Sequence, residues 1–574
     1  MSESKQHGSR HSASRIPKSA TAFAALAALY AAARLWRLTA SCLWFDEIFS
    51  VHAARHTWGA LWRFTAADLI HPPLFYALLK LWAAAGGESL QWLRLFPALT
   101  AIAALVPFLL LARELRLGAQ ATALALLLAA ANGYLIKYAQ ELRMYSLLLL
   151  LTLTSLWLFA RLLYSARAPR GLLFALFSAD LLLVYTHYYG WLVVACEAAL
   201  VAYAGRRKLR AFLPVGAGLL LCFAPWVFAC LGASGAGGGL AQNVGWIERP
   251  GARDLTQLYA LLNEPFYFRQ SSAESVYARG GALLGLLLLG VPVLLLLFRT
   301  WRRRATVSDR EALDGDARVT NDARAAVTPE ARADGVSERV GPPTFLAFFT
   351  LAPVALAFAA SRALPYSVWG TRHLIIVAAP YALLCGAALA RTRPALLKSS
   401  ALLLLSCWLL IVGALTLARD EGAHVWCAWG DLAASAARDE EAAAADDPGD
   451  ARAVNVYALE DLVAYHLWFA LEGRRGPRRY KVASLKGVPG VSEDPAYFLP
   501  RDFPEATPAP AEAFTAAPRF WLAFRDTSLD ETRPPLDFIT SRGYRPARVY
   551  EASAQGQRAF LVLFERADAA GARR

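Results

Sequence analysis

The chain has 574 residues, of which 57% are hydrophobic and 18% charged, and its mean hydropathy is +0.35. This composition is too apolar for a soluble enzyme, and Leu-, Ala- and Val-rich runs recur at the length of a bilayer span. The formal net charge of +14 lies in short clusters between these runs, with no basic face or nucleic-acid motif, so no nucleic-acid partner is expected. The sequence therefore predicts a multi-pass membrane protein.

The N-terminus is polar and basic, and residues 1–18 are expected to be disordered. The apolar run from Ala20 to Ala33 continues into RLWRL without a small-residue cleavage site, so we expect a retained helix rather than a signal peptide. Ten further apolar runs bring the number of predicted membrane spans to eleven. These runs cover residues 92–112, 119–136, 145–163, 171–186, 190–204, 211–231, 280–299, 343–361, 371–391 and 399–418.

One apolar segment, 72–86, contains Lys80 and falls short of the ~20 residues that a helix needs to cross a bilayer. We expect it to lie in the membrane interface. The basic clusters then lie on the same side of the membrane as the N-terminus, which the positive-inside rule places in the cytoplasm. Arg34 and Arg37, at the outer end of the first span, are exceptions to this rule. These clusters occupy residues 113–118, 161–170, 205–210, 299–341 and 391–398, and the charge-mixed stretch 302–341 is expected to be a mobile cytoplasmic loop.

The C-terminal part, residues 420–574, has a different hydrophobic pattern from the membrane part, residues 19–418. It contains strand-like runs at 453–459, 519–525 and 559–565 and helix-like runs at 461–471 and 535–543. This pattern predicts a small α/β domain. Eleven spans from a cytoplasmic N-terminus place that domain outside the cytoplasm.

The seven cysteines include no CxxC pair and no metal-ligand spacing, and five of them lie in apolar runs. They indicate neither a zinc site nor a disulfide framework. Whether Cys42 pairs with Cys427 stays open.

Four clusters of polar residues fall on the outer side of the predicted membrane domain. They are Asp46, Glu47 and His71; Lys137, Gln140, Glu141, Arg143 and Tyr145; His187; and Trp369, Arg372 and His373. An active site at this membrane surface explains them together. Each cluster also has a structural explanation. The acid pair would be a solvated helix start, and HPP would be a helix N-terminus with His71 near its cap. Glu141 and Arg143 would belong to a short polar loop, His187 to an aromatic belt, and Arg372 and His373 to an interfacial anchor. Asp180 and Glu197, inside predicted spans, are expected to be structural.

The stretches LWFDEIFS, HPPLFYALL, RLFPAL, QELRMYSLLL and RHLIIVAAP resemble the GT-C superfamily of membrane glycosyltransferases over about residues 20–200 and 365–385. More closely, they resemble the branch that contains protein O-mannosyltransferases, lipid A aminoarabinose transferases and rhizobial lipopolysaccharide sugar transferases. The resemblance implies interfacial helices in the first outer loop. It also implies a polyprenyl-phosphate-linked sugar donor that is used on the extracytoplasmic side.

Transfer leaves charge on a departing phosphate and needs a base for the acceptor hydroxyl. By resemblance, Asp46 is the candidate base, Glu47 orients the base or the acceptor, and Glu141 matches the second acidic position of the family. Candidates for phosphate contact are Arg143, Lys137, Arg372, His373 and His71, with Arg372 favoured for its bidentate geometry. Tyr145, His187 and Trp369 are expected to line the cavity.

Two motifs depart from the family pattern: Glu-Leu-Arg stands where some relatives have Asp, and Arg-His where many have Arg-Tyr. The acids Asp46, Glu47 and Glu141 could hold a divalent cation, but no cofactor is required and no metal ligand is assigned.

The sequence thus predicts an inverting glycosyltransferase of the bacterial inner or plasma membrane, acting on a glycan, lipid or protein acceptor. The transferred sugar and the acceptor are not predicted. Two alternatives stay open: a polytopic transporter, and a lipid-carrier polysaccharide polymerase or ligase.

Overall fold

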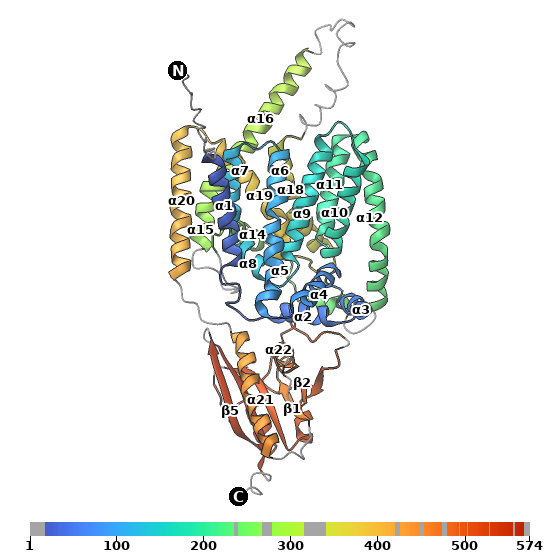
Figure 1. Ribbon diagram of the computed structural model, residues 1–574, viewed down its shortest axis with the longest axis vertical. Helices are drawn as coiled ribbons and strands as arrows, with labels where there is room; N and C mark the ends of the chain where they lie inside the picture. The colour runs from blue at the N-terminus through green and yellow to red at the C-terminus, as the bar shows by residue number, and fades with distance from the viewer. Residues whose placement is uncertain are drawn as a thin grey trace, which may run out of the picture.

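The computed structural model describes residues 18–234, 239–266, 278–314, 340–418, 425–446, 453–472, 474, 479–492, 494–501, 503–526, 528–554 and 557–567. A bundle of helices is followed, along the long axis of the molecule, by a smaller domain built on a β-sheet (Figure 1). The predicted disorder of residues 1–17 lies outside the described residues.

The eleven predicted spans all fall on helices of the bundle, which are rich in Leu and Ala. These are α1 (Lys18–Leu35), α5 (Leu90–Ala103), α6 (Leu105–Glu114), α7 (Ala119–Ala131), α9 (Tyr145–Tyr164), α10 (Arg170–Thr186), α11 (Gly190–Ala204), α12 (Arg206–Ala233), α15 (Ala278–Gly285), η1 (Leu286–Gly290), α16 (Val291–Asp314), α18 (Pro342–Ala363), η3 (Thr371–Val377), α19 (Ala378–Ala390) and α20 (Ala395–Ala418).

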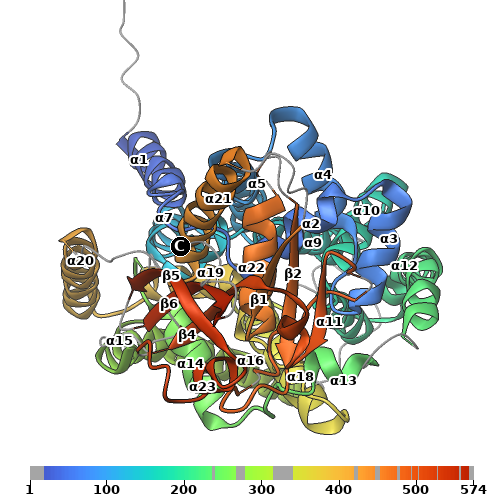
Figure 2. The same ribbon diagram turned by 90° about the horizontal axis from the view of Figure 1, so that it is seen from below.

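Among the described residues, seven helices are long and apolar enough to cross a membrane, and shorter apolar helices include α1, α7 and α11. The chain is therefore a multi-pass membrane protein. The number of eleven crossings stays a prediction. Most of these helices run side by side along the long axis, and α20 lies at the edge of the bundle (Figures 1 and 2).

Two predicted boundaries were wrong. The span predicted over 119–136 ends at Ala131, because Asn132 caps a new helix, α8 (Gly133–Gln140), by accepting a hydrogen bond from the Leu135 N–H at 2.9 Å. The loop predicted over 302–341 begins as helix, because α16 continues to Asp314 through residues with good helix propensity. Residues 315–339 lie outside the described part of the chain.

Three short helices form the loop between α1 and α5: α2 (Phe45–Arg55), α3 (Trp58–Asp68) and α4 (Leu74–Gly86). They lie at the end of the bundle that faces the sheet domain (Figure 1). The Lys80 ammonium donates to the carbonyls of Ala54 and His56 at 3.3 and 2.7 Å, so it neutralises the carbonyl end of α2.

The opposite end of the bundle, where α12 and α20 begin, carries the basic clusters 205–210 and 391–398 (Figure 1). Lys208 donates to the Leu162 carbonyl at 2.5 Å and Lys398 to the Gln120 side chain at 2.6 Å. Arg34, an exception to the charge pattern, is fully buried, where it donates to the carbonyls of Tyr30 and Ala129 at 2.9 and 3.0 Å. Its role is therefore to join α1 to α7.

The C-terminal domain is a mixed six-stranded sheet of order β3-β2-β1-β4-β6-β5, in which β1 to β4 are parallel and β5 and β6 antiparallel to their neighbours. The strands are β1 (Val454–Ala458), β2 (Tyr480–Lys486), β3 (Ala506–Pro510), β4 (Arg519–Asp526), β5 (Tyr544–Ala554) and β6 (Gln557–Arg566), and the helices α21 (Ala428–Asp446), α22 (Asp461–Glu472) and α23 (Leu536–Thr540). All five predicted elements of this domain are present.

Strands β2, β3 and β5 and helix α21 were not predicted. Strand β5 is exposed along much of its length and β3 contains two prolines at the sheet edge, so neither has the apolar alternation of a half-buried strand. Helix α21 is rich in alanine and packs against α22, β5 and β6.

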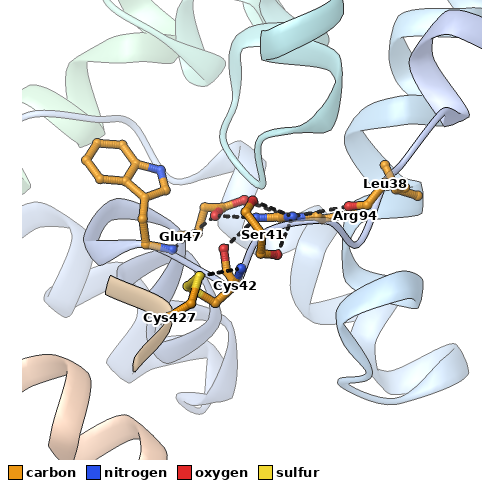
Figure 3. Close-up of a disulfide and its surroundings, with 7 residues drawn as sticks. Leu38, Ser41, Cys42, Glu47, Arg94 and Cys427 are labelled. Atoms are coloured by element: carbon orange, nitrogen blue, oxygen red, sulfur yellow. Dashed lines mark hydrogen bonds and ion pairs between the residues drawn. A yellow bond between two sulfur atoms is a disulfide. The ribbon is translucent and has the colours of Figure 1, made fainter. Parts of the chain in front are cut away.

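A disulfide joins Cys42, just before α2, to Cys427, just before α21, with the Cα atoms 5.2 Å apart (Figure 3). The sequence left this pairing open, because the two residues are 385 positions apart and belong to no cysteine motif. The bond fixes the sheet domain to the first loop.

We expect the Cys42→Ser variant to lower the free energy of unfolding by about 2–5 kcal/mol, because the unfolded chain loses a long-range constraint. Thermal unfolding of the purified protein in detergent, without reductant, measures the loss. Cys407→Ser, which removes an exposed free thiol, is the matched control. Equal unfolding midpoints for the two variants would contradict a stabilising role.

Candidate active site

Asp46 and Arg372 form an ion pair between the first turn of α2 and the short helix η3. The Arg372 Nη1 donates to the Asp46 Oδ2 at 3.0 Å. Their side chains are 21% and 32% exposed, so both groups can be reached from outside the protein core. Asp46 is thus an accessible carboxylate held beside an accessible guanidinium.

The neighbouring Glu47 is fully buried and bonded through both oxygens. Arg94 of α5 donates to it through Nε at 3.2 Å and Nη2 at 2.9 Å, and the backbone N–H groups of Leu142 and Trp44 donate at 2.7 and 3.1 Å. Arg94 also donates to the carbonyls of Leu38, Ser41 and Cys42 (Figure 3). Glu47 therefore fixes the start of α2, on which Asp46 lies.

Arg143 connects the second outer loop to the first. Its Nη1 donates to the Asp46 carbonyl at 3.0 Å and to the hydroxyls of Ser50 and Tyr76 at 3.3 Å. Its Nη2 lies 3.4 Å from His71 Nδ1, and its Nε has no hydrogen-bond partner. This buried guanidinium positions Asp46 from the backbone side and keeps one N–H unused.

Three imidazole rings gather beside Arg143: His71, His187 and His373. The ring centroids lie 5.3 Å apart for His71 and His187 and 4.6 Å apart for His187 and His373. One nitrogen from each ring lies within 4.8 Å of the other two, a spacing that could suit a metal ion. The Nε2 atoms of all three rings are buried without a hydrogen-bond partner.

The protonation of these rings decides which ligand they fit. The Tyr189 N–H donates to His187 Nδ1 at 3.0 Å, and Arg143 can only donate to His71 Nδ1. Burial, reinforced by Arg143, lowers the pKa of His71 well below its ordinary range, and burial lowers that of His187 to about 3. Both rings are therefore neutral, with Nδ1 as the acceptor and the proton on Nε2.

The carboxylates do not fit a cation either, because Asp46 is paired with Arg372 and Glu47 with Arg94. The donor set of N–H groups and guanidinium groups fits an anion better than a metal ion.

Two further acids near the site are buried. Burial raises the pKa of Glu141 to about 7, against the opposing charge of Lys137, and its Oε1 has no hydrogen-bond partner. Burial also raises the pKa of Asp68, the last residue of α3, to about 7, opposed by Arg143. Asp68 Oδ2 lies 3.8 Å from His71 Nδ1. Each acid changes its charge near neutral pH.

We expect Glu141 to make the folded protein less stable as the pH rises. Its pKa rises on folding from 4.5 to about 7, so the folded state holds a proton that the unfolded state has lost between these values. Glu141→Gln removes this cost, and the variant is expected to exceed wild type by up to about 3 kcal/mol near pH 8 and to match it near pH 4. Unfolding midpoints across this range measure the difference.

Glu248→Gln, at an exposed position, is the matched control and should follow the wild-type curve. If the unfolding midpoints of Glu141→Gln and wild type differ by the same amount at both ends of the pH range, the burial of a titrating acid is contradicted.

No protein-family model matches the chain, and no curated protein matches it. Among solved structures, ArnT from Cupriavidus metallidurans bound to undecaprenyl phosphate is similar with a TM-score of 0.51 at 13% identity, over 95% of this chain and 97% of ArnT. The archaeal oligosaccharyltransferase AglB from Archaeoglobus fulgidus, in complex with an inhibitory peptide and a dolichol-phosphate, gives a TM-score of 0.42 at 12% identity, over 80% of this chain and 64% of AglB. The chain has the GT-C fold.

Within this GT-C fold, residues from all four predicted polar clusters meet. Asp46, Arg372, Arg143 and His71 are joined by the contacts above, and His187 and His373 complete the imidazole cluster. Tyr145, fully buried with an unbonded hydroxyl, lies beside His373 with ring centroids 6.1 Å apart. The structure brings these side chains together, as the sequence predicted. Their roles in catalysis stay predictions.

Three predicted residues lie at the margin of the site. Lys137 packs its ammonium 5.3 Å from the centre of the Tyr138 ring and lies close enough to Glu141 to act on its charge. Gln140 donates to the carbonyl of Arg34 in α1 at 3.2 Å and to that of Trp36, just beyond α1, at 2.7 Å. Trp369 is buried against Phe358, with its indole N–H unbonded.

Asp180 and Glu197 lie inside the bundle, away from these residues. The Ser155 hydroxyl joins them at 2.6 and 2.7 Å, which suits the structural role expected of the pair.

Sequence reasoning missed Arg94, Asp68 and Tyr497. Arg94 is the arginine of the RLFPAL stretch, so the resemblance contained the signal, but no role was assigned to it. Asp68 precedes HPP by only three residues. Tyr497 comes from the C-terminal domain and packs edge-on against Phe45 at 5.3 Å, a contact that no local pattern indicates.

Proposed function

We propose that this protein is an inverting glycosyltransferase that moves a sugar from a polyprenyl-phosphate donor to an acceptor hydroxyl on the extracytoplasmic face of the membrane. The observation that carries the proposal is the accessible Asp46–Arg372 pair beside a buried set of N–H donors. A base and an anion-binding group must lie together for this chemistry. The solved ArnT structure with bound undecaprenyl phosphate, which has the same fold, supports a lipid-phosphate ligand.

In the proposed reaction, Asp46 accepts the proton of the acceptor hydroxyl while the hydroxyl oxygen forms a bond to the anomeric carbon of the donor sugar. The bond from that carbon to the phosphate oxygen breaks at the same time, and the phosphate leaves with the electron pair. Attack from the side opposite the leaving phosphate inverts the anomeric centre. No covalent intermediate on the protein is part of this scheme.

The leaving phosphate has a matching set of donors in Arg372, the unused Nε–H of Arg143 and the Nε2–H groups of His71 and His187. Charge-assisted hydrogen bonds from guanidinium groups stabilise phosphate strongly. A phosphate that binds Arg372 also competes with Asp46 for it. Donor binding would therefore release Asp46 to act as a base.

The proposed orientation has two supports. The basic residues lie at the N-terminal end of the bundle, as the positive-inside rule requires for a cytoplasmic end. The disulfide between Cys42 and Cys427 lies at the other end, together with Asp46, and disulfides persist in oxidising, extracytoplasmic surroundings. Both observations favour an active site and a C-terminal domain outside the cytoplasm.

The proposal is tested by incubating the purified, reconstituted protein with a panel of radiolabelled undecaprenyl-phosphate sugars and bacterial envelope fractions. We expect transfer from at least one donor, and a product whose anomeric configuration, determined by NMR, is opposite to that of the donor. Retention of configuration would contradict a single displacement. A protein that neither binds undecaprenyl phosphate nor transfers sugar would contradict the proposal as a whole.

Arg372→Ala is expected to raise the Kd for undecaprenyl phosphate by about 10- to 100-fold, the effect of losing a hydrogen bond to a charged group. Binding to the detergent-solubilised protein is measured by titration calorimetry. Arg362→Ala, at an exposed position on α18, is the matched control and should leave the Kd unchanged. Equal affinities for the two variants would remove Arg372 from the phosphate site.

A further inference from the structure

A crevice lies between the membrane part and the C-terminal domain, apart from the histidine cluster. Its volume is about 470 Å³, within the size range of ligand sites. Its walls come from the short helix α13 (Gly239–Val244), the residues that follow β1, the end of β2 and the segment 494–498. The lining side chains include Gln242, Trp246, Glu460, Asp461, Lys486 and Tyr497.

The position of this crevice follows from the sheet topology. Strands β1 and β2 are parallel neighbours, and Glu460, Asp461 and Lys486 lie at or just beyond their carboxyl ends. The chain runs from β1 outward to β2 and β3 and then returns to the other side of β1 as β4, so the strand order reverses beside β1. In open α/β sheets, ligands bind outside the carboxyl ends of the strands at such a reversal.

The crevice adjoins the start of α2, which carries Asp46, through Tyr497. Tyr497, on its wall, packs against Phe45, the residue before Asp46, with ring centroids 5.3 Å apart. Burial raises the pKa of the Tyr497 phenol, and the charge of Asp46 adds to that effect. Tyr497 therefore lies between the crevice and the start of α2, and Asp46 is close enough to act on its phenol.

The chemistry of the lining selects among ligands. Three carboxylates, Glu460, Asp461 and Asp494, line the crevice. Two cations oppose them: Lys486 pairs with Asp461 at 2.9 Å, and Arg525 pairs with Glu460. Excess negative charge disfavours a phosphorylated or otherwise acidic ligand. Carboxylates and the Gln242 amide accept hydrogen bonds from hydroxyl groups, which a saccharide supplies in number.

Aromatic rings complete the lining. Trp246 is 41% exposed, and Tyr497 and Phe498 lie on the same crevice. A large ring with an apolar face and a polar edge suits a ligand that is apolar on one side and hydroxylated at its rim. A sugar ring has this character.

We infer that the crevice is the acceptor subsite and that the acceptor is a saccharide without acidic groups, held with one hydroxyl toward Asp46. This inference rests on the proposed function and adds to it the chemical class of the acceptor. Polypeptide and lipid acceptors are the competing outcomes of the test.

The test measures binding of neutral tetrasaccharides of glucose, mannose, galactose and N-acetylglucosamine to the full-length protein by saturation-transfer NMR. A Ser/Thr-rich peptide and phosphatidylglycerol vesicles serve as competing probes. We expect saturable binding of at least one saccharide and a Kd raised about tenfold or more in Trp246→Ala. Trp58→Ala, at a tryptophan that is 54% exposed and does not line the crevice, is the matched control and should bind like wild type.

Undecaprenyl-phosphate binding is measured on the same samples and is expected to be unchanged by Trp246→Ala. Wild-type protein that binds the lipid phosphate but no saccharide, or binds saccharide equally well in Trp246→Ala, overturns the acceptor subsite and leaves the proposed transferase untouched. Preferential binding of the peptide or the vesicles at Trp246 also overturns it. Loss of lipid-phosphate binding in wild type instead counts against the proposed function.

Discussion

Asp46→Asn is expected to lower the rate of sugar transfer by about 10²- to 10⁴-fold, the usual contribution of a general base. Asparagine has nearly the same shape as aspartate but cannot accept the proton of the acceptor hydroxyl. The backbone carbonyl of residue 46, which Arg143 contacts at 3.0 Å, stays in place, so the loop should keep its position. The measurement is kcat for transfer from a polyprenyl-phosphate sugar to its acceptor.

The same variant should bind undecaprenyl phosphate at least as tightly as wild type. In the wild-type protein the Asp46 carboxylate occupies Arg372 at 3.0 Å, and its removal frees the guanidinium for phosphate. A loss of rate with gain or retention of affinity separates a base from a phosphate ligand. Asp431→Asn, at an exposed position of α21, is the matched control. Undiminished transfer in Asp46→Asn would contradict the assignment of the base.

The helices were predictable because lipid-facing runs of Leu and Ala have a length that the bilayer dictates. The basic loops predicted that the polar clusters share one side of the membrane, and this prediction grouped the candidate residues. Their contacts did not follow, since Asp46 and Arg372 are 326 positions apart and meet only through the packing of the whole bundle. Periodicity reports which face of a helix is apolar, but it does not report the partner across a tertiary contact.

Residues with purely internal partners were the least predictable. No role was assigned to Arg94 from the sequence, and only the structure shows its guanidinium enclosed by Glu47 and three backbone carbonyls. The edge strand β5 lacks a regular apolar face, so pairing with β6 rather than its own pattern defines it. In both cases the determining interaction is distant in the chain.

Glu47→Gln is expected to lower the free energy of unfolding by about 3–5 kcal/mol, because it leaves the Arg94 charge buried without its partner. The exposed fractions of the two side chains are 0% and 2%, so water cannot replace the lost contact. Glu88→Gln is the matched control, because its partner Arg55 lies on the same helix as Glu47. The Glu88 and Arg55 side chains are 37% and 29% exposed, so the loss of this ion pair should lower the free energy of unfolding by about 1 kcal/mol or less. Unfolding midpoints in detergent measure both variants.

The double variant Glu47→Gln/Arg94→Gln distinguishes an ion pair from a merely crowded site. Removing both charges leaves no isolated buried ion, so the double variant is expected to be less destabilised than the sum of the two single variants. Strict additivity would contradict the coupling. Because Glu47 and the N–H groups of Leu142 and Trp44 fix the first turn of α2, the single variants should also lose transfer activity through misplacement of Asp46, even under conditions in which they stay folded.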